Sequence, residues 1–129
     1  MARRRTRLRR AEDDELAMHE LSICGSIARL AQEHADGRRV IAVHLDVGHL
    51  RQVVPDTLRS SWEFVVDDTA LAGSQLIVNY IPAVIHCHGC DASTTLTAPV
   101  FRCPCGSIDT HVTAGEELSI RSLDLARPD

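Results

Sequence analysis

Two closely spaced pairs of cysteines are the residues of this chain best suited to chemistry. The first pair lies in Cys87-His88-Gly89-Cys90 and the second in Cys103-Pro104-Cys105-Gly106, with residues 91–102 between them. Thiolates at this spacing are typical of a tetrahedral zinc site of zinc-ribbon type, in which each pair binds the ion from one turn. Residues 91–102 are rich in serine, threonine and β-branched residues, which predicts a short hairpin between the turns. We therefore predict zinc ligation by Cys87, Cys90, Cys103 and Cys105.

Two other interpretations of these cysteines stay open from sequence alone. One is a pair of disulfides, although Cys24 would be left over and neighbouring cysteines on a turn have poor disulfide geometry. The other is a site in which His86 or His88 replaces one thiolate.

The two cysteine pairs also differ in spacing. The second pair has one residue between its cysteines where the first has two, and Pro104 stiffens that turn.

A second candidate metal site lies at Met18-His19-Glu20. So short a motif has low specificity, and a solvated helix start is the simpler interpretation. Its meaning changes if Met18 is the amino terminus, because the α-amine, the backbone nitrogen and the imidazole of His19 can then chelate one ion. Amine, amide and imidazole nitrogens in a plane suit Ni(II) or Cu(II) better than zinc. An amide must lose its proton to bind, so such a site would weaken at low pH.

Charge is unevenly distributed along the chain. Six of the 14 arginines and four of the 18 acidic residues lie in residues 1–17, and lysine is absent. Residues 18–129 therefore carry eight arginines against 14 acidic residues, a net charge of −6, which argues against a nucleic-acid-binding face. Residues 1–17 match no targeting class. We expect them to be an extension read from an upstream start codon, with Met18 as the true initiator.

Hydrophobic periodicity predicts two helices. The first covers Glu20–His34 and ends at Asp36-Gly37. Its expected buried stripe is Leu21, Cys24, Ile27 with Ala28, and Ala31. The second helix opens at Val54-Pro55, and its expected buried stripe is Leu58, Trp62, Val65 and Val66.

Alternating segments predict three strands, at Val40–Val47, Gln75–His86 and Glu117–Leu125. In the first strand the buried phase should be Ile41, Val43, Leu45 and Val47. We predict an α+β fold, with two helices packed on a small mixed three-stranded sheet and a zinc-ribbon-like module inserted between the last two strands. Those two strands should pair antiparallel.

The length of 129 residues and the hydrophobic share of 44% suit one domain with a small metal module. We expect residues 18–84 and 115–129 to form a nickel-binding α+β domain and residues 85–114 to form the zinc-binding module. No apolar run approaches the roughly 18 residues that a membrane-spanning helix needs, so we expect no membrane partner.

Several segments together resemble the HypA/HybF nickel metallochaperones. They are Met-His-Glu-Leu-Ser at Met18–Ser22, Cys-Gly-Ser at Cys105–Ser107 and Gly-Glu-Glu-Leu-Ser-Ile at Gly115–Ile120. The resemblance covers Met18 to about Ala126. It implies a non-enzymatic protein that carries Ni(II) as transient cargo for maturation of [NiFe]-hydrogenase and, in some members, of urease.

The resemblance also implies residue roles. His19 would be the nickel ligand, with the Met18 amine and the backbone of His19 and Glu20 as co-ligands. The four paired cysteines would hold structural Zn(II), although the family's second pair has two residues between its cysteines. The implied partners are a nickel-binding GTPase of the HypB type, the hydrogenase large subunit and urease accessory proteins. The implied location is cytoplasmic, and the chain would be a monomer or a homodimer.

Two other classes of function remain to be weighed against nickel delivery. A zinc-ribbon adaptor for protein or nucleic acid would need a suitable face, and residues 87–111 offer only Arg102 as a cation. An enzyme with catalytic zinc would need an open coordination position, which four thiolates would close. His86 and His88 could add a secondary metal contact beside the cysteines, and His49 could approach a metal from its loop.

Overall fold

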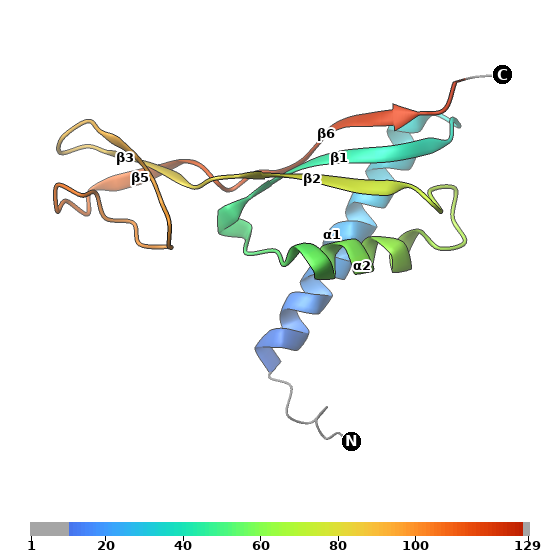
Figure 1. The fold of residues 1–129 in the computed structure, drawn as a ribbon, viewed down its shortest axis with the longest axis horizontal. Coiled ribbons are helices and arrows are strands. Elements are labelled where there is room, and N and C mark those ends of the chain that lie inside the picture. The colour runs from blue at the N-terminus through green and yellow to red at the C-terminus, as the bar shows by residue number, and fades with distance from the viewer. Residues whose placement is uncertain (1–10, 128–129) are drawn as a thin grey trace. The chain divides into compact units, whose positions relative to one another are not determined.

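The computed structural model describes residues 11–127 and, within its first helix, the side chains from His19 onward. It contains two α-helices, a short 3-10 helix and six strands (Figure 1). Their bounds are α1 Ala11–Ala35, β1 Val40–Gly48, η2 His49–Arg51, α2 Pro55–Val66, β2 Gln75–Ile81, β3 Val84–Cys87, β4 Ser93–Thr95, β5 Thr110–Ala114 and β6 Leu118–Leu125. The strands form two three-stranded sheets, ordered β2-β1-β6 and β4-β3-β5. The predicted α+β class with an inserted ribbon is confirmed.

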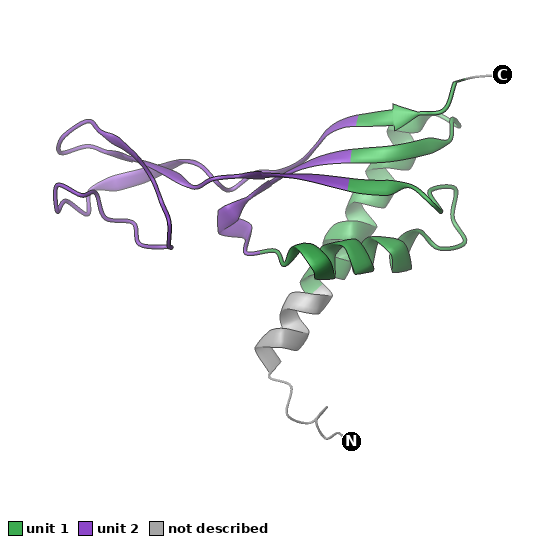
Figure 2. Cartoon of the chain, in the orientation of Figure 1, with its two compact units in different colours: residues 1–43, 53–76, 123–129 green, residues 44–52, 77–122 purple. Residues whose placement is uncertain are grey.

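The chain divides into two compact units (Figure 2). Unit 1 comprises residues 1–43, 53–76 and 123–129, and unit 2 comprises residues 44–52 and 77–122. Both helices lie in unit 1, whereas β3, β4 and β5 lie in unit 2. Residues 85–114, the expected zinc module, fall within unit 2. Among residues 11–127, no helix is long and apolar enough to cross a bilayer.

Unit 1 is built on the packing of α1 against α2. The buried residues of α1 recur every three or four positions, as expected for one face of a helix: Glu20, Ile23, Cys24, Ile27, Ala31 and Ala35. Leu21, expected in this stripe, is 36% exposed, because it lies about 100° around the helix from Glu20. In α2 the stripe of Leu58, Trp62 and Val66 is confirmed, while Val65 is only half-buried.

The burial of β1 follows the predicted alternation over only part of its length. Val43, Leu45 and Val47 are buried as expected, but Ile41 is 45% exposed and Ala42 is buried. The first four residues of the strand are all apolar, so the sequence pattern there contains no polar residue to fix which phase faces inward.

The strand predicted at Gln75–His86 is in fact two strands in different sheets. Pro82 lacks an N–H and lies between β2 and β3, where a continuous ladder would need that donor. The expected pairing of this strand with the last strand is wrong, because β6 pairs with β1. Their antiparallel direction follows from two backbone bonds of 2.8 Å, Gly48 N–H to Glu117 O and Ala126 N–H to Arg39 O. The strands that enter and leave the ribbon, β3 and β5, do pair antiparallel.

Three backbone segments of unit 2 approach closely at Gly48, Gly115 and Ala83. A Cβ atom on Gly48 would overlap the carbonyl group of Gly115, and a Cβ on Gly115 would lie 2.6 Å from Cα of Ala83. Gly115 also has φ of 112°, a conformation that favours glycine. The carbonyl of Gly115 accepts the Leu50 N–H at 2.8 Å, so the two segments cannot separate without losing a buried bond.

We expect Gly48→Ala to lower the free energy of unfolding by about 3 kcal/mol or more, because its methyl group would meet backbone that cannot move aside. Gly25→Ala is the matched control, since a Cβ there meets nothing within 4 Å in the middle of α1. That control should gain about 0.5–1 kcal/mol from the higher helix propensity of alanine. Urea unfolding of both variants at fixed metal content measures the difference, and equal stabilities would contradict the close approach.

Candidate metal centres

The first cysteine pair lies where β3 ends in a tight turn. Cys87 is the last residue of β3 and is fully buried. The Asp91 N–H donates to the Cys87 carbonyl at 2.9 Å, and the Gly89 N–H donates to the Cys87 sulfur at 3.3 Å. Asp91 closes the turn with φ of 65°, which Asp tolerates better than most residues. The turn thereby directs Cys87 and Cys90 to the same side.

The second cysteine pair lies in a turn closed by its own backbone. The Cys103 N–H donates to the Ser107 carbonyl at 3.0 Å, and the Gly106 N–H donates to the Cys103 carbonyl at 2.8 Å. Gly106 has φ of 98°, where glycine carries no steric cost. One residue between Cys103 and Cys105 is therefore enough for both sulfurs to reach the cluster.

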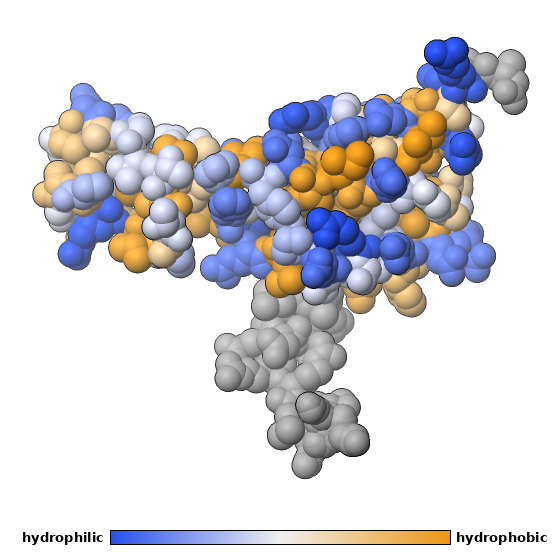
Figure 3. All heavy atoms as spheres, in the orientation of Figure 1, coloured by the Kyte–Doolittle hydropathy of each residue, from blue (hydrophilic) through white to orange (hydrophobic). Residues whose placement is uncertain are grey.

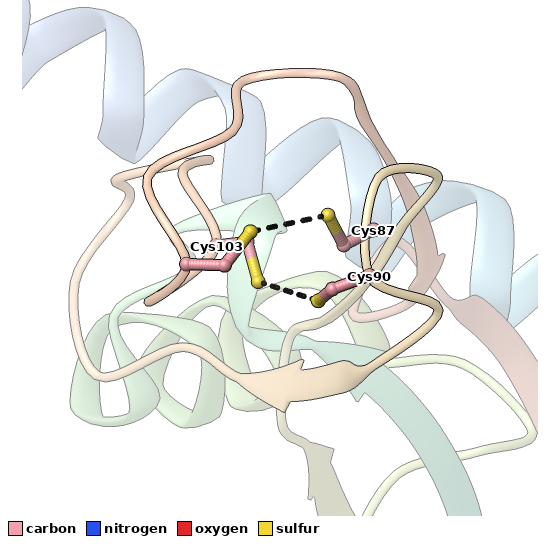
Figure 4. Close-up of side chains that lie close together, drawn as sticks. Cys87, Cys90 and Cys103 are labelled. Carbon is pink, nitrogen blue, oxygen red and sulfur yellow. Dashed lines mark hydrogen bonds between the residues drawn. The ribbon is translucent and has the colours of Figure 1, made fainter.

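The four sulfur atoms converge and lie within 4.8 Å of one another. Cys87 Sγ lies 3.8 Å from Cys105 Sγ, and Cys90 Sγ lies 3.5 Å from Cys103 Sγ, so each contact joins one turn to the other. Figure 4 shows the labelled thiols directed toward a common centre. Tetrahedral zinc with Zn–S bonds of about 2.3 Å places its sulfurs about 3.8 Å apart, so the cluster is consistent with a zinc site.

The described structure favours four-cysteine ligation over the alternatives. All five cysteines are free thiols, with no disulfide between the two pairs. Among the described residues, the group placed to hold a metal contains the four cysteines and no histidine. His86 precedes the buried Cys87 on β3, and because side chains alternate along a strand, the two face opposite sides of the ribbon.

The thiols of the cluster differ in acidity because backbone N–H groups, burial and the neighbouring thiols act on each of them to a different extent. The backbone N–H of Cys90 is the main cause that lowers the pKa of Cys87 to about 6; burial opposes it. The backbone N–H of Cys105 lowers the pKa of Cys103, but burial and the three neighbouring thiols outweigh it and raise that pKa to about 12. Four adjacent thiolates repel one another, so a divalent cation is needed for all of them to ionise together.

The residues of the second candidate site lie together on α1 but differ in environment. Met18 lies within the helix, and its side chain is outside the described residues. His19 is exposed, whereas Glu20 is only 1% exposed. In a helix that begins at Ala11, the N–H groups of His19 and Glu20 are in the helix interior, where each bonds to the carbonyl four residues earlier.

The carboxylate of Glu20 joins the start of α2 to α1, a role that sequence reasoning missed. Its Oε2 atom accepts the N–H of Val54 at 2.6 Å, and Val54 is the N-cap residue of α2. A carboxylate beside a helix N-terminus is favoured by the helix dipole. Its Oε1 atom is buried without a hydrogen-bond partner. One feature of the sequence could have indicated this role: Glu20 is a charged residue at the first position of the buried face of α1.

Comparison with known proteins decides the family. The family model described as "Hydrogenase/urease nickel incorporation, metallochaperone, hypA" matches residues 18–125. This chain belongs to the HypA family. A hydrogenase maturation factor HypA from Chloroflexus aurantiacus is 41% identical over an alignment 112 positions long, which covers 83% of this chain and 98% of the relative. Another HypA, from Geotalea uraniireducens, is 38% identical over 109 residues, which is 84% of this chain and 99% of the relative.

Solved HypA structures share the fold. A solution structure of HypA protein superposes with a TM-score of 0.64 at 22% identity, covering 84% of this chain and 97% of that one. The nickel metallochaperone HypA from Helicobacter pylori superposes with a TM-score of 0.59 at 20% identity, covering 82% and 96%. The predicted HypA/HybF membership is confirmed. By the names printed for the family and its members, it is a family of metallochaperones and maturation factors.

We expect Glu20→Ala to lower the free energy of unfolding by about 2 kcal/mol, because the Val54 N–H would lose a charged acceptor in a buried site. Glu33→Ala is the matched control, since Glu33 is an exposed residue on the same helix and should change stability by less than about 0.5 kcal/mol. Denaturant unfolding followed by helical circular dichroism measures both. Equal effects would show that the carboxylate does not anchor α2.

Zinc uptake by the cysteine cluster should release protons at pH 7.5, because the pKa of Cys103 lies above that pH and its thiol must ionise to bind. The affinity should fall as the pH falls, most steeply where protons begin to compete for Cys87, whose pKa is about 6. Calorimetry in buffers of different ionisation enthalpy counts the protons.

Cys103→Ser should release fewer protons and bind zinc about a hundredfold more weakly or worse. Cys24→Ser is the control, because Cys24 is buried on α1 outside the cluster. Proton release that is the same for parent and Cys103→Ser would rule out four-thiolate binding.

Proposed function

We propose that this HypA family member carries Ni(II) at Met18, His19 and Glu20 and delivers it for maturation of [NiFe]-hydrogenase, with urease as a second possible recipient. The observation that carries the proposal is the family match, which begins at Met18 and describes nickel incorporation. The HypA relatives are matched over 98–99% of their length by this chain. The exposure of His19 leaves its imidazole accessible to an incoming ion.

The proposal requires that the working protein begins at Met18. In a helix that starts there, the first four N–H groups have no carbonyl partner, so the amides of His19 and Glu20 are free to lose a proton and bind. In the longer helix from Ala11 these amides are bonded within the helix. The backbone of Glu20, rather than its side chain, would serve nickel, because the carboxylate is held by Val54.

Zn(II) is the proposed resident ion of the four cysteines. Four thiolates close its coordination shell, so the ion would hold the two turns together and perform no catalysis. The ligand types determine which metal each site prefers, since four thiolates in a tetrahedron favour zinc and planar nitrogen ligands favour Ni(II). Residues 18–84 and 115–129 would then serve nickel, and residues 85–114 would serve zinc.

The proposed partners follow from the family's role in hydrogenase maturation. They are a GTPase of the HypB type, the hydrogenase large subunit and, where urease is served, its accessory proteins, all in the cytoplasm. A zinc-ribbon adaptor that binds protein without transferring nickel is the second candidate. It is favoured by apolar side chains at the surface of unit 2 (Figure 3), which include Val100, Phe101 and Ile108.

Nickel titration of three proteins tests the proposal: the chain that begins at Met18, its His19→Ala variant and the full 129-residue chain. The chain from Met18 should bind one Ni(II) as a planar, diamagnetic species. His19→Ala should weaken this binding about a hundredfold or more, since even groups that support a ligand contribute 10–100-fold. The full chain should not form the planar species, because its amides are held in α1. Equal planar Ni(II) binding by the chain from Met18 and its His19→Ala variant would refute delivery through this motif.

A further inference from the structure

Three histidines gather on one face of the ribbon, opposite the cysteine cluster. His86 on β3 is directly across from His111 on β5 in the antiparallel register. His88 follows two residues after His86, and its N–H donates to the Asp109 carbonyl at 2.9 Å, which continues the pairing past the end of β3. Residues two apart on a strand share a face, so the three rings lie on one side of the ribbon. The centroid of His111 lies 4.7 Å from that of His88 and 5.5 Å from that of His86.

The closest contact in this group joins two ring nitrogens. His111 Nδ1 lies 2.9 Å from His88 Nε2. Two imidazole nitrogens bound at right angles to one ion, each at about 2.0–2.1 Å, lie about 2.9 Å apart. The simpler account of the contact is an N–H···N hydrogen bond between neutral rings, and a change of tautomer in whichever ring donates would free both nitrogens for an ion. Both side chains are exposed, so an ion can reach them.

His86 has the environment of a supported metal ligand. Its Nε2 atom lies 3.1 Å from Asp91 Oδ1, within reach of an N–H···O bond. Donation of the Nε2 proton to this carboxylate leaves Nδ1 with a free lone pair. The one contact of Nδ1, with Ser93 Oγ, is 3.4 Å long and therefore weak. A carboxylate behind a histidine is the usual support of a metal-binding imidazole, because it fixes the tautomer and makes the ring more basic.

From this arrangement we infer that His88 and His111, whose ring nitrogens already meet, form a second nickel-binding site on the outer face of the ribbon, which His86, supported by Asp91, completes when its ring turns toward the ion. Imidazole nitrogens suit Ni(II), Cu(II) and Zn(II), and three of them leave coordination positions for water. This site uses none of the four cysteines and none of the residues of the amino-terminal motif. It therefore stands or falls independently of nickel delivery through His19.

Calorimetric titration of the full chain with Ni(II), in a His19→Ala background loaded with one zinc, tests the inference. The parent should bind one Ni(II) in a paramagnetic, six-coordinate form without releasing zinc, which a zinc indicator monitors. Changing His88 and His111 to alanine together should weaken this binding at least tenfold. His34→Ala, an exposed histidine on α1, is the matched control and should leave it unchanged.

Two further variants test the inference if the double substitution of His88 and His111 disturbs the ribbon. His111→Ala alone removes one ligand that belongs to β5 rather than to a cysteine turn. Asp91→Asn keeps a residue that tolerates the positive φ but removes the charge behind His86, and should weaken nickel about tenfold. Retained zinc in each variant shows that the ribbon is intact. The inference is overturned if the His19→Ala chain takes up nickel only by displacing zinc, takes up none, or binds it equally well without His88 and His111.

Discussion

The convergence of four thiols is the constraint on which the ribbon depends. Between residues 85 and 114, the described side chains that are buried and apolar are Ile85, Cys87 and Cys103, far too few to form a hydrophobic core. Four sulfurs within 4.8 Å cannot all ionise without a cation, and the pKa values of Cys87 and Cys103 have moved apart accordingly. Metal binding in such modules contributes roughly 10–16 kcal/mol, which is enough to replace a core. The two turns that the cluster joins lie between β3 and β5, whose antiparallel register sets which side chains meet across the ribbon.

In unit 1 the corresponding constraint is the buried carboxylate of Glu20. It ties the beginning of α2 to α1 through the Val54 N–H, at the place where a helix N-terminus favours a negative charge. Its neighbour His19 is exposed because successive residues on a helix differ by about 100° in direction. One step along the helix thus separates a residue that stabilises the packing of two helices from a residue free to bind an ion.

The ribbon uses the alternation of a strand in a similar way. Cys87 faces the thiol cluster, while His86 and His88, on either side of it, face outward beside His111. Sulfur ligands on one face and imidazole nitrogens on the other differ in the ions they prefer and in how tightly they hold them. A rigid four-thiolate clamp suits a permanent ion, and exposed imidazoles suit one that must leave. With both proposed sites occupied, the ribbon would present two kinds of metal chemistry on its two faces without sharing a ligand.

Local patterns in the sequence were sufficient to predict that there are two helices, though not that α1 begins as early as Ala11, and to predict the grouping of the four cysteines, the family and the fold class, because each depends on spacing along a few residues. The partner of β6, the break at Pro82, the exposure of Leu21 and Ile41, the anchoring of α2 by Glu20 and the meeting of His88 with His111 depended on tertiary structure. These features arise between residues up to tens of positions apart, and alternation along one strand does not specify which strand lies beside it. The physical reason is that hydrophobic periodicity is a property of a few consecutive residues. Strand pairing and side-chain burial depend instead on contacts between segments that are far apart in the sequence.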